Sequence, residues 1–259
     1  HMLSIYPLHP PAPTARGAPL DATVEDYRKV QQRLGLERAV VVQPSAYGTD
    51  NRCTLDSIAA LGLDRARGIA VVDESADVVE LEALTRGGIR GVRFHMLPGG
   101  ALLWESLDAI ADKVQSVGWH IQLQLDGRTL PDRECQIRSW PGRIVIDHVG
   151  KFLEPVGPDH PAFRCLQGLV ETGRVWIKLS APYEVSKSGA PGYGDVGRLA
   201  KELVRMAPER MLWASNWPHP SVKDKPDDAT LLDLLLDWAP DGATRHRILV
   251  ENPEELYGF

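Results

Sequence analysis

The sequence predicts an α/β fold and, within that class, a (β/α)8 barrel. Short runs that are almost continuously apolar recur along the 259 residues, as expected for parallel strands covered on both faces. Helical patterns separate these runs, and seven such alternations require a parallel sheet. A hydrophobic content of 43% can fill one sizeable core at this length, so one barrel or two modest domains would fit. A doubly wound sheet is the structural alternative.

Strands are predicted where β-branched and other apolar residues cluster. The first of the eight barrel strands is truncated or incomplete, because only a degenerate stretch near residues 1–6 stands in its place. The other predicted strands cover residues 38–43, 68–72, 89–94, 119–125, 144–148, 175–180 and 211–213.

Helices are predicted between these strands. Thr23 is among the capping residues before the first helix, and the pair Gly87–Gly88 ends the third. Asp50 or Asn51 offers a cap for the second helix. The predicted helices cover residues 24–34, 51–61, 77–86, 102–117, 161–172 and 195–206.

We expect a single domain that spans residues 1–259, because no low-complexity segment or internal linker interrupts the alternation. The proline-rich opening, residues 7–19, is either an ordered loop over a barrel end or a disordered tail.

The composition narrows the range of partners. A net charge of −6 and a pI near 5.8 argue against a nucleic-acid or anionic membrane surface, but not against an anionic small-molecule substrate. Cys53, Cys135 and Cys165 have no metal-ligand spacing and fit a reducing compartment. No apolar run reaches the roughly 18 residues of a membrane span, and no signal-peptide pattern is found. We therefore expect a cytoplasmic protein, and we leave its oligomeric state open.

Polar side chains collect where the predicted strands end, and in a parallel barrel those ends form the active site. Imidazole, guanidinium, amide and hydroxyl groups would converge there on one cavity. The set comprises Gln43, Ser45, Asp73, Arg93, His95, Gln124, Asp126, His148, Lys178, Ser180 and Asn216.

Arg93 and His148 are the strongest charged candidates. Arg93 lies near a strand end and suits a bidentate carboxylate clamp, although an ion pair with Asp73 or Asp126 is the structural alternative. His148 follows a buried strand, where an imidazole costs desolvation unless it has a partner or a function. Its neighbour Asp147 points to the other face and is expected to make a structural bond.

The loops after the strands supply further candidates. Asn216 follows the last strand in a proline-broken loop, and its amide orients a substrate but is a poor proton acceptor. Ser45 and Tyr47 are placed to hydrogen-bond a ligand. The loop 97–100 allows close backbone approach to a ligand or needs unusual dihedral angles, and the long connection 181–193 has the length of a lid.

Several common site types are not predicted. A barrel metallohydrolase needs several His and carboxylate ligands, and this chain has no His-x-His motif. Gly-x-Ser-x-Gly, P-loop and Gly-x-Gly-x-x-Gly patterns are also missing from the sequence. We therefore expect no metal ion, no nucleotide cofactor and no serine nucleophile.

Four separated motifs resemble the amidohydrolase superfamily, and more narrowly its lactone-handling branch, which includes 2-pyrone-4,6-dicarboxylate lactonase and D-galactarolactone isomerase. They are VVQPSAYGTDN at 41–51, GVRF at 91–94, IDHVGK at 146–151 and NWPH at 216–219. The resemblance extends from about Tyr27 to residues 252–257, nearly the whole chain. The first-strand His motif of the family is missing or reduced to His1–Met2.

The resemblance implies a (β/α)8 barrel that acts on sugar-acid or pyrone lactones without a bound metal. It implies that Ser45 and Tyr47 hold the ligand, Arg93 binds its carboxylate and His148 contacts the reacting lactone. The lactonase pattern has an aspartate at the position of Asn216, where it activates water. Asn216, with the segments 124–127, 97–100 and 183–184, is more similar to the isomerase. On this basis His148 and Asn216 are the predicted catalytic residues, and the predicted substrate-binding residues are Ser45, Tyr47, Arg93, Gln124, Asp126, Tyr183 and His219.

Three functions follow from these observations. The first is a metal-independent aldarolactone isomerase, in which a substrate hydroxyl attacks the lactone carbonyl. The second is a lactone hydrolase in which His148 or Asp126 activates water. The third is a sugar-acid-binding barrel without catalysis.

Overall fold

A computed structural model describes residues 9, 11–12 and 22–259 of the chain. The incomplete first strand expected near residues 1–6 and most of the proline-rich opening lie outside these residues. The chain divides into two compact units, which we describe one at a time. The first unit comprises His1–Leu123, Trp140–Gly142 and Phe259, and the second comprises Gln124–Ser139 and Arg143–Gly258.

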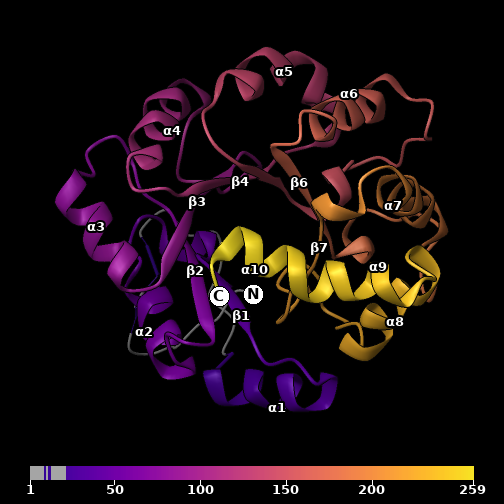
Figure 1. The fold of residues 1–259 in the computed structure, drawn as a ribbon, viewed down its shortest axis with the longest axis horizontal. Helices are drawn as coiled ribbons and strands as arrows, with labels where there is room; N and C mark the ends of the chain where they lie inside the picture. The colour runs from indigo at the N-terminus through magenta and orange to yellow at the C-terminus, as the bar shows by residue number, and fades with distance from the viewer. Residues whose placement is uncertain (1–8, 10, 13–21) are drawn as a thin grey trace. The chain divides into compact units, whose positions relative to one another are not determined.

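The first unit alternates helices with parallel strands. Strands β1, β2, β3 and β4 follow one another in chain order, and Ala39 lies beside Ala66 in the parallel register of β1 and β2. Its helices and strands, of which the α and β elements are labelled in Figure 1, are α1 (Val24–Leu34), β1 (Ala39–Val42), η1 (Ser45–Tyr47), α2 (Arg52–Leu61), β2 (Ala66–Ala70), α3 (Val78–Arg86), β3 (Ile89–His95), η2 (Trp104–Ser106), α4 (Leu107–Gln115) and β4 (His120–Gln124).

Two helix caps of the first unit, at Thr23 and Gly87, confirm the sequence signals, and a third differs. The side chain of Thr23 accepts a hydrogen bond from the backbone N–H of Asp26 at the start of α1. Gly87 is the C-cap of α3. Asn51 occupies the N-cap position of α2 but makes no side-chain cap bond, so the expected cap is wrong for this residue. The Asp50 carboxylate accepts instead from the backbone N–H of Arg52, at 3.2 Å.

Asn51 also explains why β2 ends earlier than predicted. Its side-chain oxygen accepts from the backbone N–H of Val71 at 2.9 Å, and its amide nitrogen donates to the Val71 carbonyl at 2.8 Å. The strand was expected over 68–72 and spans Ala66–Ala70. It ends there because the Asn51 side chain binds the backbone N–H and carbonyl of Val71, which a neighbouring strand would otherwise bind.

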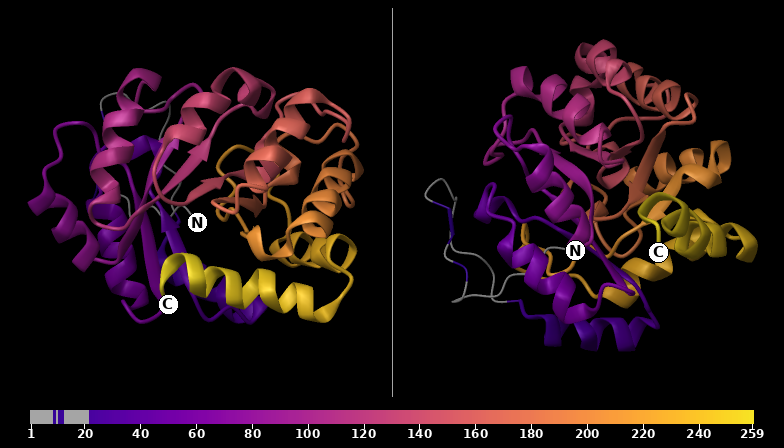
Figure 2. Two further views of the ribbon diagram at one scale, coloured as in Figure 1. Left: turned by 45° about the horizontal axis from the view of Figure 1, so that its top comes forward. Right: turned by 60° about the vertical axis from the view of Figure 1, so that its left-hand side comes forward.

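The second unit repeats the same alternation. Strands β5, β6 and β7 are parallel neighbours, with Ile146 beside Ile177 and Ile177 beside Met211. Its elements are η3 (Gly127–Thr129), α5 (Leu130–Ser139), β5 (Ile144–Ile146), η4 (His148–Gly150), α6 (Pro161–Val170), β6 (Val175–Leu179), η5 (Pro182–Glu184), α7 (Gly194–Met206), η6 (Pro208–Arg210), β7 (Met211–Trp213), α8 (Asp228–Trp238), α9 (Gly242–His246), η7 (Arg247–Glu251) and α10 (Asn252–Tyr257). Figure 2 shows α9, η7 and α10 as one continuous helical run.

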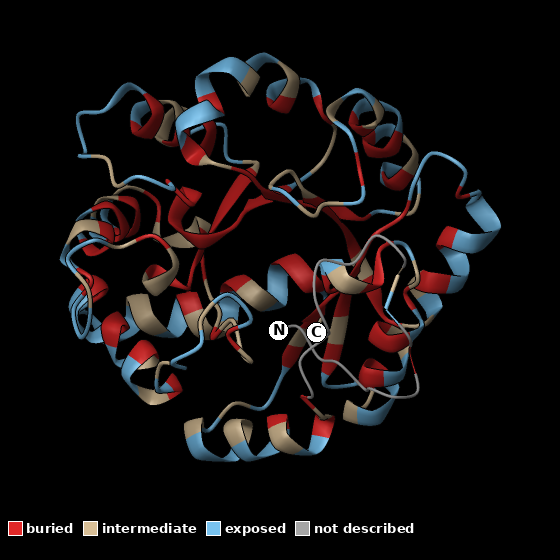
Figure 3. Cartoon of the chain, turned by 180° about the vertical axis from the view of Figure 1, so that it is seen from behind, coloured by how far each residue is buried: buried red, intermediate tan, exposed pale blue. Residues whose placement is uncertain are grey.

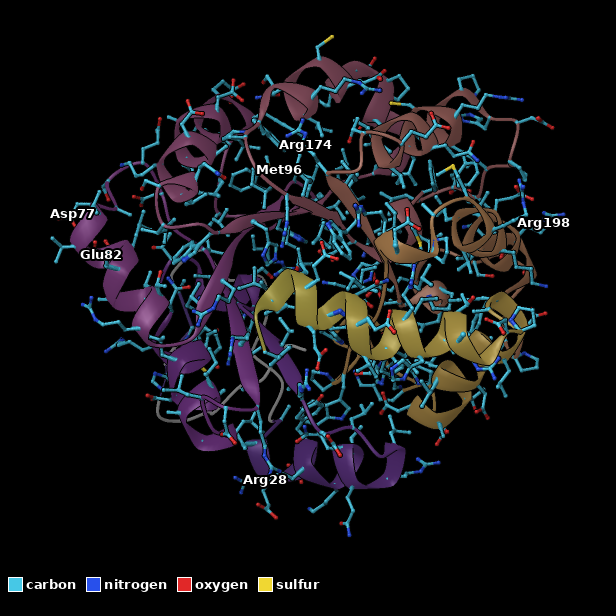
Figure 4. The ribbon with its side chains drawn as sticks, in the orientation of Figure 1. Arg28, Asp77, Glu82, Met96, Arg174 and Arg198 are labelled. Atoms are coloured by element: carbon cyan, nitrogen blue, oxygen red, sulfur yellow. The ribbon has the colours of Figure 1, made fainter. Side chains whose placement is uncertain are left out.

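Each unit buries its strands and exposes the outer faces of its helices. Figure 3 shows the strands almost entirely in red, whereas the helices alternate between red and pale blue. In the first unit Phe94 packs edge-on against Trp140, with ring centroids 5.3 Å apart. The labelled Arg28, Glu82 and Arg198 lie on outer helix faces (Figure 4), and all three are exposed. Within the described residues, no helix is long and apolar enough to cross a membrane.

Candidate active site

The ends of β5, β6 and β7 in the second unit carry a cluster of polar residues. His148, Ser180 and Asn216 follow these three strands directly or within a few residues. The backbone here is unusual, because non-glycine residues adopt positive φ angles that cost free energy in L-amino acids. They are His148 (56°), Val149 (55°), Lys151 (45°), Ala181 (48°), Asn216 (59°) and His219 (57°). Such strain gathers at functional sites more often than elsewhere.

His148 is a buried, neutral imidazole. Its Nδ1 lies 2.7 Å from the Ser180 hydroxyl oxygen, which leaves Nε2 for another partner. Burial lowers the pKa of His148 to about 4, against the raising effect of Asp147 and Glu184 and with a further lowering effect of nearby lysines. At neutral pH the ring is therefore uncharged. The structural bond expected of Asp147 is confirmed, because its carboxylate lies 2.6 Å from Lys178 Nζ.

Glu184 is a buried carboxylate that remains ionised. Lys151 donates to its Oε2, and the Ser221 hydroxyl donates to Oε1 at 2.7 Å. Burial raises the pKa of Glu184, but the positive charge of Lys151 and the hydrogen bonds from Lys151 and Ser221 outweigh burial and bring this pKa to about 2. Lys151 and Glu184 were not among the predicted site residues. The only sequence signal was their place in the stretches 146–151 and 183–184 that resemble the family.

Asn216 is held by donation to two acceptors. Its Nδ2 donates to the Tyr183 hydroxyl oxygen at 2.9 Å and to Glu184 Oε1 at 3.1 Å. The Tyr183 oxygen lies 2.8 Å from Nδ1 of His219, and burial raises the pKa of Tyr183. His219 is only 2% exposed, and its Nε2 lies 3.2 Å from Asp228 Oδ1. The predicted residues Asn216, Tyr183 and His219 thus form one hydrogen-bonded group.

Gln124 and Asp126 lie at the start of the second unit. Gln124 is buried at the end of β4. The Asp126 carboxylate caps η3, lies 2.6 Å from the Arg128 guanidinium, and accepts from the backbone N–H of Leu153 at 3.3 Å. These bonds give Asp126 a structural role in the loop that it begins.

The first unit contains the predicted carboxylate clamp. Arg93 is buried near the end of β3, and its Nη1 donates to the Gln43 carbonyl at 2.8 Å. Its Nη2 lies 3.3 Å from Nδ1 of His95. A buried guanidinium fixed by backbone and imidazole contacts is preorganised for a planar anion.

Gln43 organises the loop that carries Ser45 and Tyr47. Its amide nitrogen donates to the carbonyls of Gly48 and Asp50, at 3.0 and 2.8 Å, and its oxygen accepts from Thr54 at 2.6 Å. Ser45 is exposed and Tyr47 is buried, so the two predicted ligand contacts differ in access to solvent.

The loop 97–100 turns tightly against its own strand. Gly99 has a φ of 100°, and a Cβ at Gly100 would lie 1.8 Å from the His95 carbonyl oxygen. The positive φ of Gly99 agrees with the prediction of unusual dihedral angles in this loop. The close packing of Gly100 on β3 explains the second glycine.

The donors around His148 do not fit a metal ion. The part of the chain that the structure describes contains no group of three or more His, Cys, Asp or Glu side chains that could hold one. His148 Nδ1 faces Ser180, Asp147 is paired with Lys178, and Lys151 adds a second cation nearby. A divalent cation would meet repulsion from both lysines.

Parallel strands with polar residues at their carboxyl ends are typical of α/β enzymes that carry the active site at this edge of the sheet. The amidohydrolase model matches residues 4–259, and the chain belongs to this family of enzymes. It is 38% identical over 256 residues to D-galactarolactone isomerase of Agrobacterium fabrum, covering 97% of this chain and 87% of that protein. It is 34% identical over 259 residues to a 2-pyrone-4,6-dicarboxylate hydrolase of Comamonas testosteroni, covering 96% and 85%.

A solved structure confirms the predicted fold class. The crystal structure of an Agrobacterium tumefaciens protein without ligand matches this chain with a TM-score of 0.94 and 37% identity. The match covers 100% of this chain and 94% of that one. The α/β fold of the barrel type and the predicted branch of the family are therefore confirmed.

Proposed function

We propose that this enzyme interconverts ring forms of anionic sugar-acid lactones without a metal ion, as an aldarolactone isomerase. The name of the Agrobacterium fabrum relative supports the reaction class. The observation that carries the proposal is the donor role of Asn216, whose amide nitrogen faces Tyr183 and Glu184. An amide at this position orients a hydroxyl group but does not deprotonate water.

The proposed reaction consumes no water. A substrate hydroxyl attacks the lactone carbonyl carbon, a new C–O bond forms, and the original ring C–O bond breaks. The proton of the attacking hydroxyl passes to the oxygen that leaves. Holding both groups in contact supplies much of the rate, since intramolecular attack reaches effective concentrations of roughly 10⁵–10⁸ M in well-oriented cases.

His148 is the proposed proton carrier. Its neutral ring takes the proton from the attacking hydroxyl and returns it to the leaving oxygen, through the nitrogen not engaged by Ser180. Burial and the charges of Lys151 and Lys178 disfavour the imidazolium formed in between, and the nearby carboxylates of Asp147 and Glu184 offset part of that cost. Arg93 is the proposed carboxylate clamp of the first unit, and Ser45, Tyr47, Gln124 and Asp126 stay proposed ligand contacts.

A lactone hydrolase is the second candidate, favoured by the name of the Comamonas testosteroni relative. Water activation would fall to His148, Asp126 or Glu184. Both Glu184 oxygens already accept hydrogen bonds, and Asp126 is paired with Arg128, which makes either carboxylate a weak base. The isomerase is therefore the preferred proposal. We also propose a place in the cytoplasm, which is supported by the lack of a disulfide bond among Cys53, Cys135 and Cys165 in the described part of the chain.

Proton NMR of the purified enzyme with D-galactaro- and D-glucaro-lactones tests the proposal. We expect conversion between ring forms at the same rate with and without a chelator. His148→Gln should abolish conversion, whereas His160→Gln, at the exposed N-cap of α6, should retain it. Release of free aldarate would make the enzyme a hydrolase. Loss of activity with the chelator would refute metal independence, and binding without turnover would leave a sugar-acid-binding barrel.

A further inference from the structure

A row of four side chains ends at the Asn216 amide, and it runs from buried Asp228 and His219 to half-buried Tyr183 and Asn216. Asp228, the first residue of α8, lies 3.2 Å from His219 Nε2, and His219 Nδ1 lies 2.8 Å from the Tyr183 oxygen. Asn216 Nδ2 donates to that oxygen at 2.9 Å. All four residues belong to the second unit but come from three separate segments. The Tyr183 and His219 rings also pack edge to face, with centroids 5.4 Å apart.

The direction of each hydrogen bond follows from the chemistry of the groups. An ionised carboxylate only accepts, so the Asn216 atom at 3.1 Å from Glu184 must be the amide nitrogen. That nitrogen also donates to the Tyr183 oxygen, so the Tyr183 hydrogen is free to point to His219 Nδ1. The ring proton of neutral His219 then lies on Nε2, facing Asp228.

This arrangement leaves one atom of Asn216 for a ligand. Both hydrogens of its amide nitrogen are engaged by acceptors, and no described residue donates to its carbonyl oxygen Oδ1. Either acceptor alone would hold the amide less firmly. With both in place, a rotated amide would set its oxygen against the Glu184 carboxylate, which is repulsive.

We propose that Asp228, His219 and Tyr183 are positioning residues that hold the Asn216 amide in one orientation, with Oδ1 accepting from the attacking hydroxyl of the substrate. This inference rests on the proposed lactone isomerisation. It also defines the ligand group that Asn216 binds, namely a hydrogen-bond donor such as a hydroxyl. His219, expected to bind substrate, acts on this view through Tyr183.

The backbone of the loop supports the role. Asn216 and His219 both have positive φ, and the carbonyl of His219 accepts a bond from Lys225 Nζ. The loop is thus held in a costly conformation that brings the His219 ring behind Tyr183. Asp228 Oδ1 and His219 Nε2 are close enough for an ion pair, but their orientation does not meet the angle requirement of a hydrogen bond. Contacts of this kind often tighten when a substrate binds.

The test compares the products of four variants with those of the wild-type enzyme. Tyr183→Phe, His219→Leu and Asp228→Asn should lower kcat by about a hundredfold, as expected for a misplaced reacting group, with a smaller change in KM. They should also raise the share of hydrolysed product relative to ring isomer, because a loosely held hydroxyl competes less well with water. His219→Asn keeps an acceptor near Nδ1 and should restore kcat to within about tenfold of wild type.

The product ratio does not depend on how much of the enzyme is folded, which separates positioning from stability. Asp233→Asn, at an exposed position of the helix that also contains Asp228, is the matched control and should leave rate and ratio unchanged. An unchanged product ratio in all three of Tyr183→Phe, His219→Leu and Asp228→Asn would overturn the proposal.

If the wild-type enzyme makes no ring isomer, the proposed function is refuted. A second measurement then still tests the hydrogen-bonded row Asp228–His219–Tyr183–Asn216. ¹⁵N NMR of the histidine rings should show His219 protonated on Nε2 alone, with its Nδ1 signal displaced in Tyr183→Phe. A proton on His219 Nδ1 would overturn the proposed hydrogen-bond direction from Tyr183 to His219, whichever reaction the enzyme catalyses.

Discussion

At the scale of single residues, the candidate site depends on charges that the fold removes from water. The side chains of Lys151 and Glu184 are only 10% and 7% exposed, and they form an ion pair. Removing one partner of such a pair leaves the other as a buried, uncompensated charge. The pair Lys187–Glu154 in the same unit is exposed by 65% and 63%, with its atoms 3.6 Å apart, and provides a natural comparison.

We expect Lys151→Met to lower the free energy of unfolding by about 3–5 kcal/mol, because Glu184 would lose its cation. Lys187→Met should lower it by no more than about 1 kcal/mol, the usual value of an exposed pair. Urea denaturation of both variants measures the difference. Equal losses would show that the Glu184 carboxylate is solvated in solution.

The buried imidazole of His148 makes stability depend on pH. Its pKa is about 4 in the folded chain and 6.5 ordinarily, so between these values only the unfolded chain takes up the proton. The corresponding stability is fully present above pH 6.5 and is lost as the pH falls towards 4, roughly 3 kcal/mol in total.

Urea titrations from pH 7 to 4 measure this loss. The advantage of wild type over His148→Gln should shrink by that amount on acidification. His246→Gln, at an exposed position, should run parallel to wild type. Parallel curves for His148→Gln would contradict the neutral buried ring.

Asn216→Asp distinguishes the two candidate reactions. The change places a second carboxylate about where the amide nitrogen lies 3.1 Å from Glu184, replacing attraction by repulsion. We expect ring isomerisation to fall by about 10²–10³-fold, the usual cost of losing an oriented polar group at a reacting centre. Proton NMR follows both products at once. A rise in hydrolysis that exceeds the wild-type isomerisation rate would favour the hydrolase.

These residues also show what could be predicted about the site. His148, Asn216 and Tyr183 stand out because a polar side chain follows an apolar strand or belongs to a family motif. Lys151 and Glu184 do not, because a charged residue in a loop is usually solvated. Only the folded second unit shows that β5 and β6 end beside each other and bury the two charges together.

At the scale of elements, the strands and caps were predictable and some helices were not. Helix α5 begins with Leu130 and Pro131 and buries only Leu130 and Ile137, so it lacks an apolar stripe. Strand β5 ends at Ile146, two residues before the predicted end, because His148 already has a left-handed backbone. Hydrophobic periodicity cannot report a backbone angle imposed by neighbouring segments.

Gly91 within β3 shows a second kind of hidden constraint. A Cβ at this position would lie 2.8 Å from both the ring and the carbonyl oxygen of His120. We expect Gly91→Ala to lower the free energy of unfolding by about 1–3 kcal/mol through overpacking. Gly157→Ala, where a Cβ meets nothing within 4 Å, should be neutral or stabilising by at most about 1 kcal/mol. Thermal melts of both variants test this, and an unaffected Gly91→Ala would show that β4 yields at His120.

At the scale of the whole molecule, the single domain over residues 1–259 stays a prediction. The unbroken alternation of strands and helices supports it, as does a solved structure that matches the full chain. Differential scanning calorimetry tests it. One cooperative unit of 259 residues should unfold with roughly 180 kcal/mol near 60 °C and equal calorimetric and van't Hoff enthalpies. Two independently unfolding units would give a van't Hoff value about half the calorimetric one.

The left-handed residues after β5, β6 and β7 have a consequence for how this enzyme can evolve. Each costs about 1–2 kcal/mol for a side chain such as that of Val149, whereas glycine and asparagine adopt the same angles more easily. A population selected for heat resistance alone should therefore accumulate glycine or asparagine at 149 and 181, whereas Lys151 is retained by its buried ion pair with Glu184. A population selected for turnover should keep the residues found here. At these strand ends, selection for stability at high temperature and selection for turnover of the substrate would favour different residues.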